Sequence, residues 1–250
     1  MSGLLEGQTA FITGAGRPTG IGFATARLFL AHGARVAIID VADMDPLGAA
    51  RTLGKGVVGY VCDVRSDEQC RDAVERATQD VGEIGVLISN AGVVQPRRVL
   101  EIARSDYDFV LDVNLRGTLN VAQAVLPKMV ARNEGSVVCI SSITGQRGGI
   151  FGGAHYSASK AGILGLVKTM AREFGAKNIR VNAICPGVIV TGFTSGPKAE
   201  SDNAKAKEEV PLGRLGDGDD VAGACLFLAS DLARYVTGAV IDVNGGLHIH

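Results

Sequence analysis

Tyr156 and Lys160, four residues apart, are the side chains of this sequence whose types and spacing first suggest chemistry. On a helix, residues four apart lie on the same face, one turn from each other. A tyrosine has a pKa of about 10, and lowering it by roughly three units takes about 4 kcal/mol. An ammonium roughly 4 Å away supplies about that much at an effective dielectric constant of about 20. The pair therefore predicts a phenol that transfers protons near neutral pH, and the alternative is a solvated helix face.

The elements that must position this pair are short β-branched runs alternating with longer helical patterns. The runs are nearly all apolar, as is typical of strands covered on both faces, and their alternation with helices predicts a parallel sheet. We therefore expect one α/β domain over residues 1–250, doubly wound, with about seven strands and helices on both faces. The expected strands are Thr9–Thr13, Arg35–Ile39, Val57–Cys62, Val86–Ser89, Ser136–Ile140, Ile179–Ile184 and Ala239–Val243. The expected helices are Ile21–His32, Ser66–Val81, Ser105–Arg132, His155–Lys177 and Asp219–Ser230.

The overall composition excludes several classes of protein. A net charge of −1 with 20% charged residues gives no electrostatic attraction for nucleic acid or an anionic membrane. No apolar run reaches the roughly 18 residues of a membrane span, and the N-terminus lacks the pattern of a signal peptide. The five cysteines form no C-x-x-C pair, so we expect reduced, buried thiols in a cytoplasmic protein and no metal site.

A glycine-rich turn follows the first strand and precedes a helix. In that context glycines let the backbone approach a pyrophosphate, and the helix N-terminus supplies unpaired N–H groups. The alternative is a tight turn that binds nothing. The residues expected to meet the phosphates are Gly14, Gly16, Arg17, Gly20, Ile21 and Gly22.

Asp40 stands at the end of the second strand. A carboxylate there accepts hydrogen bonds from an adenosine ribose and repels a 2′-phosphate, so it favours NAD over NADP. Arg17 argues in the opposite direction, since an arginine in the turn can meet a phosphate. The alternative for Asp40 is a loop cap.

Further polar residues follow the third, fourth and fifth strands. Ligands of open parallel sheets bind outside the carboxyl ends of the strands, so these segments lie where an adenine, a ribose and a substrate would bind. Each alone is an ordinary strand-to-helix turn. The segments are Asp63-Val64, Asn90-Ala91-Gly92 and Ser141-Ser142.

A hydroxyl, a phenol and an ammonium thus converge at one edge of the predicted sheet. This set suits the interconversion of an alcohol and a carbonyl compound. Tyr156 passes the proton, Ser142 hydrogen-bonds the reacting oxygen, and the cofactor gives or takes a hydride. The alternative for Ser142 is a turn hydroxyl bonded to its own backbone.

Taken together, these motifs resemble the short-chain dehydrogenase/reductase family, in its compact branch of about 250 residues with a Rossmann-type fold. The likeness spans essentially the whole chain, and the specificity lies in the order of the motifs. They are the glycine turn, Asp63-Val64, Asn90-Ala91-Gly92, Asn114 in DVNLRG, Ser142 in ISSITG, Tyr156-x-x-x-Lys160, Pro186-Gly187 with Thr191, Pro211–Arg214, and Asn244-Gly245-Gly246.

The resemblance implies a catalytic set of Asn114, Ser142, Tyr156 and Lys160. In the family the lysine also binds the nicotinamide ribose, and the asparagine carbonyl holds a water on the proton path. The resemblance further implies a homotetramer with paired long helices and a C-terminus near a neighbouring subunit. It places Pro186, Gly187, Ile189 and Thr191 against the cofactor, toward its carboxamide and pyrophosphate.

The sequence departs from the family pattern at four places. Arg17-Pro18-Thr19 puts three residues where the family usually has one, which predicts a longer phosphate loop. The spacing from Ser142 to Tyr156 is one residue longer than is common, so Ser141 or Ser142 takes the catalytic role; the following Ile143-Thr144-Gly145 favours Ser142. Asn244 stands where the family usually has Asp, and Ser89 where it usually has Asn.

The substrate is left open by the sequence among a secondary alcohol, a cyclic alcohol, a polyol and a 3-oxoacyl thioester. We expect its contacts from residues 93–96 and 144–153, and from a lid over residues 192–209. Phe151, Phe193 and Gln146 suggest a mixed apolar and polar pocket, and the alternative is that both phenylalanines are packing. The rival functions are an NADP-linked ketone or 3-oxoacyl reductase and a non-catalytic NAD-binding sensor.

Overall fold

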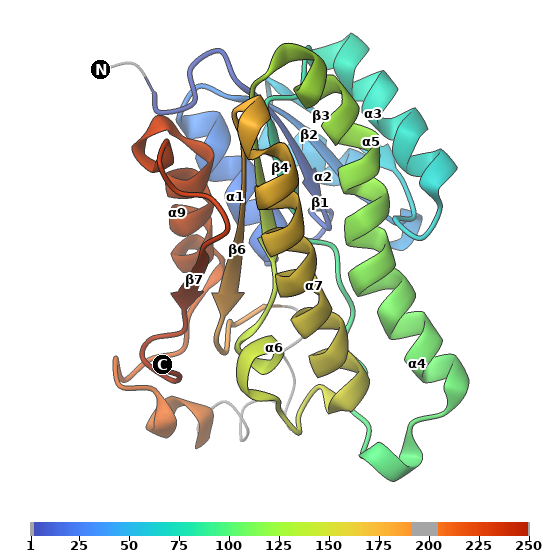
Figure 1. Cartoon of the computed structure of the whole chain (residues 1–250), viewed down its shortest axis with the longest axis vertical. Coiled ribbons are helices and arrows are strands. Elements are labelled where there is room, and N and C mark those ends of the chain that lie inside the picture. The colour runs from blue at the N-terminus through green and yellow to red at the C-terminus, as the bar shows by residue number, and fades with distance from the viewer. Residues whose placement is uncertain (1–2, 192–204, 250) are drawn as a thin grey trace.

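A seven-stranded parallel sheet, in the order β3-β2-β1-β4-β5-β6-β7, is the centre of the protein. The computed structural model describes residues 3–191 and 205–249 (Figure 1). The chain runs outward from β1 to β3 and then returns to add β4 on the other side of β1, so the strand order reverses between β1 and β4. Open α/β sheets bind ligands at such a switch point, outside the carboxyl ends of the strands. The strands are β1 Thr9–Thr13, β2 Arg35–Asp40, β3 Val57–Val61, β4 Val86–Ser89, β5 Gly135–Ile140, β6 Ile179–Pro186 and β7 Val240–Val243.

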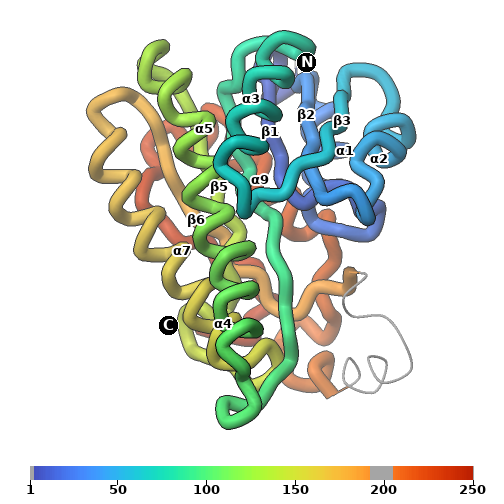
Figure 2. The backbone as a smooth tube through the Cα atoms, turned by 90° about the vertical axis from the view of Figure 1, so that its right-hand side faces the viewer, coloured from blue at the N-terminus to red at the C-terminus, as the bar shows by residue number. Residues whose placement is uncertain are grey.

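Helices cover both faces of the sheet. Helices α1 and α9 pack on one face, and α3, α5 and α7 pack on the other, each set over its own apolar core. Figure 1 shows α9 and α7 on opposite sides of β6, and Figure 2 shows α5 and α7 side by side on one face. This arrangement confirms the doubly wound fold. The helices are α1 Ile21–Ala31, α2 Pro46–Leu53, α3 Asp67–Val81, α4 Arg104–Leu111, α5 Gly117–Arg132, α6 Ile143–Arg147, α7 Gly153–Phe174 and α9 Gly218–Ala229.

The apolar strand runs are explained by the two cores. Successive side chains of a strand point to opposite faces of the sheet. In β1, Phe11 packs into the core under α3 and α5, and Ile12 packs into the core under α1 and α9. Both side chains are fully buried, so apolar residues are required on both faces of the strand at these positions.

Two helices that the sequence pattern did not predict lie in loops after strands. Helix α2 begins directly after Asp45, whose Oδ1 accepts a hydrogen bond from the Gly48 amide, with Pro46 in its first turn. Helix α6 begins after Ser142, whose hydroxyl accepts a hydrogen bond from the Thr144 amide. Both are too short for a periodic apolar pattern to reveal them.

The long helix expected over Ser105–Arg132 is wrong as a single element. It consists of α4, a π-helical turn over Asp112–Arg116, and α5. The π-turn carries Asn114 at its centre, fully buried, and such turns occur often at functional sites.

The remaining differences concern boundaries. Helix α7 begins two residues before the expected His155 and ends at Phe174, followed by a short 3₁₀ turn over Gly175–Lys177. Of the predicted lid, residues 192–204 lie outside the described part of the chain, and residues 205–209 are helical. No helix in the described ranges is both long and apolar enough to cross a membrane.

Candidate active site

The glycine turn after β1 has no room for a side chain at Gly14 or at Gly22. Gly14 has a φ of +67°, and a Cβ there would lie 2.7 Å from the Ala91 Cα atom. A Cβ on Gly22 would lie 2.6 Å from the Gly14 carbonyl oxygen. The Asn90 amide nitrogen locks the turn to the end of β4 by donating to the carbonyl oxygens of Thr13 and Gly14, at 2.9 Å each. Backbone therefore lines this part of the sheet edge, as close approach of a pyrophosphate requires.

The three extra residues form a turn of their own. The Gly20 amide donates to the Arg17 carbonyl at 2.9 Å, with Pro18 at the second position, and α1 then begins at Ile21. Gly20 offers no side chain to cap α1, and the first turn of α1 contains no acidic residue. No acidic side chain of the cap or first turn of α1 thus competes for the N–H groups of this helix end, which fits a bound phosphate.

Asp40 ends β2 and is held by the glycine turn. Its carboxylate accepts hydrogen bonds of 2.9 Å from the amides of Gly16 and Val41. Burial raises the pKa of Asp40, and these two amides together with the Arg17 guanidinium oppose that rise. The carboxylate is thus oriented by the next residue of its own loop and by Gly16, in the turn that faces the expected cofactor.

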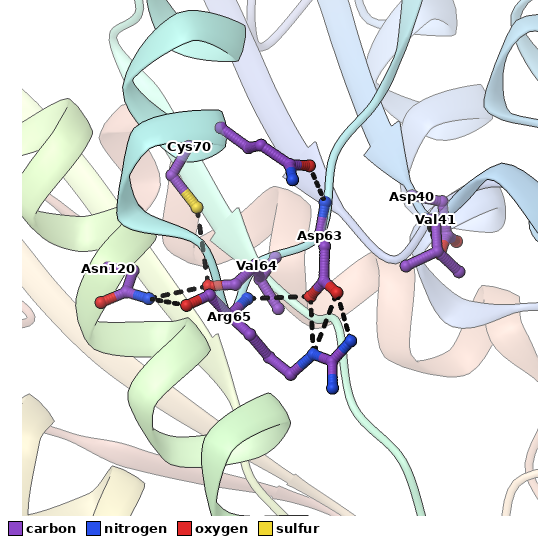
Figure 3. A network of polar contacts seen from close by, with 8 residues as sticks. Asp40, Val41, Asp63, Val64, Arg65, Cys70 and Asn120 are labelled. Carbon is purple, nitrogen blue, oxygen red and sulfur yellow. Dashed lines mark hydrogen bonds and ion pairs between the residues drawn. The ribbon is translucent and has the colours of Figure 1, made fainter. Parts of the chain in front are cut away.

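Asp63, directly after β3 and Cys62, is tied to Arg65 (Figure 3). The Arg65 side chain binds the carboxylate through Nε, at 3.0 and 2.9 Å, and through Nη2, at 2.5 Å. Hydrogen bonding to Arg65 lowers the pKa of Asp63. The Asn120 amide fixes the loop by donating to the carbonyl oxygens of Val64 and Arg65. We call the glycine turn, Asp40 and Asp63–Arg65 the nucleotide end.

Lys160 is buried at the other end of the site, with 4% of its surface exposed. Its Nζ donates a 2.9 Å hydrogen bond to the carbonyl oxygen of Ile140, the last residue of β5. Burial lowers the pKa of Lys160 to about 8, and the thiols of Cys139 and Cys185 oppose the shift. A Cβ on Gly92 would lie 3.3 Å from both the Lys160 Nζ and the Asn114 Oδ1, so the end of β4 passes directly over these two groups.

The pKa expected for Tyr156 is wrong in this structure. The Lys160 Nζ lies 5.8 Å from the centroid of the Tyr156 ring and is engaged with Ile140. Burial raises the pKa of Tyr156, a hydrogen bond with Ser142 opposes the rise, and Cys185 adds to it. Desolvation raises the pKa of Tyr156 by more than the ammonium lowers it. The sequence did not predict this because spacing along a helix fixes which face a residue occupies, but not how deeply its polar atoms are buried.

The two serines after β5 have different partners. The Ser141 hydroxyl donates to the Lys160 backbone carbonyl at 2.8 Å, which joins β5 to α7. The Ser142 hydroxyl meets the Tyr156 phenol and accepts from the Thr144 hydroxyl at 3.1 Å. Of the two, Ser142 is therefore the one that the structure brings to Tyr156.

Asn114 ties the loop after β4 to α7. Its side chain accepts from the Val93 amide at 2.8 Å and donates to the Val93 carbonyl and the Ser159 hydroxyl, at 3.0 Å each. Its own backbone carbonyl accepts from the Thr118 hydroxyl at 2.8 Å. Together with Ser142, Tyr156 and Lys160, Asn114 forms what we call the chemical end.

The segment after β6 lies against the C-terminal turn. The Gly187 amide donates to the Val243 carbonyl at 2.9 Å, and a Cβ on Gly187 would lie 2.8 Å from the Asn244 Cα. Ile189 pairs with Gly216 in an isolated β-bridge, and Thr191 is the last described residue before the gap. Asn244 itself accepts from the Gly246 amide and donates to the His248 carbonyl, so it shapes a turn.

Some contacts of the site have no signal in the sequence. Val93 and Ser159 are partners of Asn114, and Gln146 donates to Asp242, a residue 96 positions away. The only hint was that residues 93–96 and 144–153 follow strands four and five. Across the described ranges, no group of three or more histidine, cysteine or acidic side chains is placed to hold a metal ion.

The comparisons with known proteins agree with this geometry. A family model described as enoyl-(acyl carrier protein) reductase matches residues 14–248. An uncharacterised short-chain type dehydrogenase/reductase of Sinorhizobium fredii is 48% identical, over 99% of this chain and 100% of that protein. The chain belongs to the short-chain dehydrogenase/reductase family. It is therefore an oxidoreductase, of a family that uses a nicotinamide cofactor on small molecules.

Other members differ in their named activities. A 3-oxoacyl-[acyl-carrier-protein] reductase of Thermotoga maritima is 42% identical, over 98% of this chain and 99% of that protein. A crystal structure from Sinorhizobium meliloti, titled as a candidate short-chain alcohol dehydrogenase, has a TM-score of 0.88 and 34% identity, over 97% of each chain. Membership of the family thus fixes the reaction type and leaves the substrate open.

Proposed function

We propose that the protein interconverts a secondary alcohol and a ketone by hydride transfer with NAD(H), with Tyr156 as the acid and base. The observation that carries the proposal is the contact between the Tyr156 phenol and the Ser142 hydroxyl, with Lys160 and Asn114 beside them at the carboxyl end of the sheet. A reacting oxygen between the phenol and the hydroxyl would receive two hydrogen bonds.

Each residue of the chemical end has a separate task in this proposal. Because burial raises its pKa, Tyr156 is protonated at neutral pH and can donate to a ketone oxygen; in the reverse direction its oxygen accepts the proton. Ser142 orients the reacting oxygen. Lys160 carries positive charge below about pH 8, beside the site of proton transfer. Asn114 holds the loop after β4 in place through Val93.

The nucleotide end fits NAD(H). The glycine turn leaves backbone for the pyrophosphate, Asp40 would accept the adenosine ribose hydroxyls, and Lys160 would reach the nicotinamide ribose. When bound, the nicotinamide supplies or accepts the hydride. The proposed cofactor residues are Gly14, Gly16, Arg17, Gly20, Ile21, Gly22, Asp40, Asp63, Val64, Asn90, Ala91, Gly92, Tyr156, Lys160, Pro186, Gly187, Ile189 and Thr191.

The second candidate is an NADP-linked ketone or 3-oxoacyl reductase. It is favoured by the 42% identity to a 3-oxoacyl-[acyl-carrier-protein] reductase and by the charge of Arg17 near Asp40. The Asp40 carboxylate opposes it, since a 2′-phosphate beside it would be repelled. A non-catalytic NAD-binding sensor is a weaker rival, because the Tyr, Lys, Ser and Asn set is complete.

The proposal includes a cytoplasmic homotetramer. Apolar side chains are exposed on the long helix α5 and at the C-terminus, with Leu119 36% exposed and Ile249 83% exposed. A tetramer with paired long helices would cover such surface. The five free, buried cysteines suit a reducing compartment.

The experiment is a rate screen of the purified protein with secondary alcohols, diols, sugar alcohols and 3-hydroxyacyl esters, each with NAD⁺ and NADP⁺. Formation of reduced cofactor is followed by absorbance. Turnover with NAD⁺ on an alcohol supports the proposal. Turnover confined to NADP⁺ and hydroxyacyl esters favours the second candidate, and NADH binding without turnover favours the sensor.

A further inference from the structure

Buried polar atoms without a partner gather around the chemical end. Within the described part of the chain, such side-chain atoms occur in Gln95, Gln146, His155 and Ser157. Gln95 follows the loop that Asn114 holds, Gln146 belongs to α6, and the other two flank Tyr156 in α7. An unpaired buried polar atom costs free energy, so a group of them at one end of the molecule requires an explanation.

The hydrogen bond to Asp242 fixes the orientation of the Gln146 side-chain amide. Its Nε2 donates to Asp242 Oδ1 at 3.0 Å. A carboxylate only accepts hydrogen bonds, so the nitrogen must face Asp242 and the oxygen must face away from it. That oxygen, Oε1, is buried and has no donor among the described residues. It is an acceptor held in a fixed direction.

Two contacts place helix α6, which carries Gln146, and its anchor Asp242 beside the chemical end. Helix α6 begins at Ser142 and presses against α7, since a Cβ on Gly145 would lie 2.8 Å from the Lys160 backbone. In Figure 1, α6 lies beyond the carboxyl ends of β6 and β7, alongside the start of α7. Asp242 pairs in register with Cys185 of β6. The Cys185 thiol is hydrogen-bonded to Ser141, and its charge contributes to the raised pKa of Tyr156.

This inference rests on the proposed function. We infer that the Gln146 Oε1 accepts a hydrogen bond from a second hydroxyl of the substrate, and that the substrate is a polyhydroxy alcohol such as a diol or sugar alcohol. A substrate with a hydroxyl donor beside its reacting carbon would satisfy the Gln146 Oε1. A 3-oxoacyl chain brings acceptor oxygens and CH₂ groups to this position and leaves Oε1 unpaired. Asp242 is a positioning residue that orients the Gln146 amide.

The test compares substrate pairs that differ by one hydroxyl, namely 2,3-butanediol with 2-butanol and 1,2-cyclohexanediol with cyclohexanol. We expect kcat/KM to be roughly tenfold or more higher for each diol, the effect of one well-made hydrogen bond. In Gln146→Leu the preference should fall to about one, because the rate on each diol falls toward that on its mono-alcohol. Gln79→Leu, an exposed glutamine on α3, is the matched control and should keep the preference.

Positioning by Asp242 has its own readout. Asp242→Asn lets the Gln146 amide turn either way, so the diol preference should fall only part of the way, with the change mainly in KM. If Asp242→Asn keeps the wild-type preference for diols, Asp242 does not orient the Gln146 amide.

A binding measurement separates this inference from the proposed function. With NADH bound, a diol should raise the melting temperature of the wild type and not of Gln146→Leu. Diol binding without turnover would contradict the proposed function and leave the inference standing. Equal kcat/KM for diols and mono-alcohols in the wild type, or higher activity on 3-hydroxyacyl esters than on diols, would overturn the inference.

Discussion

The nucleotide end and the chemical end lie on the same edge of one sheet, and they differ in how their polar groups are hydrogen-bonded. At the nucleotide end, backbone amides hold the Asp40 carboxylate, and Arg65 holds the Asp63 carboxylate. At the chemical end, Lys160 is buried and donates to the Ile140 carbonyl, and Gln146 and His155 carry buried atoms that nothing in the described chain satisfies.

The difference indicates where each end obtains its stability. The carboxylates of the nucleotide end are already hydrogen-bonded, so that end is organised before the cofactor binds. The chemical end bears a desolvation cost in the free protein, which is visible as a lowered pKa of Lys160 and a raised pKa of Tyr156. Substitutions at the chemical end should therefore change turnover strongly, and those at the nucleotide end should change cofactor choice and affinity.

Lys160→Met is the substitution with the largest expected effect. It removes the ammonium beside the proton-transfer site, so kcat should fall by at least about a hundredfold, the usual contribution of such groups. Steady-state kinetics with NAD⁺ measure the loss. The exposed Lys168 lies on the same helix, and Lys168→Met should retain activity. If Lys160→Met keeps most of the wild-type kcat, proton transfer does not need the ammonium, and the contrast drawn between the two ends is wrong.

The same variant tests the burial of the ammonium through stability. The pKa of Lys160 is about 8 in the folded protein and about 10.5 when exposed, so between these pH values the unfolded chain binds a proton that the folded protein lacks. The free energy of unfolding should then rise with pH across this window, by up to about 3 kcal/mol from this group. Urea unfolding of wild type and Lys160→Met at pH 8 and pH 10 should show a smaller rise in the variant.

Asp40→Ala should change the cofactor choice. It removes the carboxylate that repels a 2′-phosphate, so kcat/KM for NADPH should rise about tenfold while that for NADH falls by a similar factor. The exposed Asp43, in the same loop, is the control, since Asp43→Ala should leave the ratio unchanged. If Asp40→Ala gains nothing with NADPH, the role given to Asp40 is wrong.

Arg65→Gln should have the smallest effect. Its ion pair with Asp63 is partly exposed, with 47% of the Arg65 side chain accessible, and such pairs contribute little. The dissociation constant for NADH should rise about two- to fivefold, measured by fluorescence titration, with kcat unchanged. Arg71→Gln removes the exposed Arg71–Asp67 pair on α3 and should change nothing. A loss of kcat in Arg65→Gln would show that the two ends are not separable.

The sequence predicted the features that depend on local pattern. The strands follow from apolar runs buried on both faces, and the ligand edge follows from their parallel order. The π-turn at Asn114 was missed because the residues on both sides of it are helical, so the pattern predicts one continuous helix. The direction of the Tyr156 pKa was missed because it depends on the depth of burial, and the Gln146–Asp242 pair was missed because it joins elements 96 residues apart.

The central claim is that Tyr156 transfers the proton while the rest of the site binds the cofactor. The most direct measurement is turnover and NADH affinity of Tyr156→Phe, on whichever alcohol the wild type oxidises. We predict that kcat falls by at least about a hundredfold, while the dissociation constant for NADH, measured by fluorescence, changes by less than about threefold. Near-normal turnover in Tyr156→Phe would contradict the account.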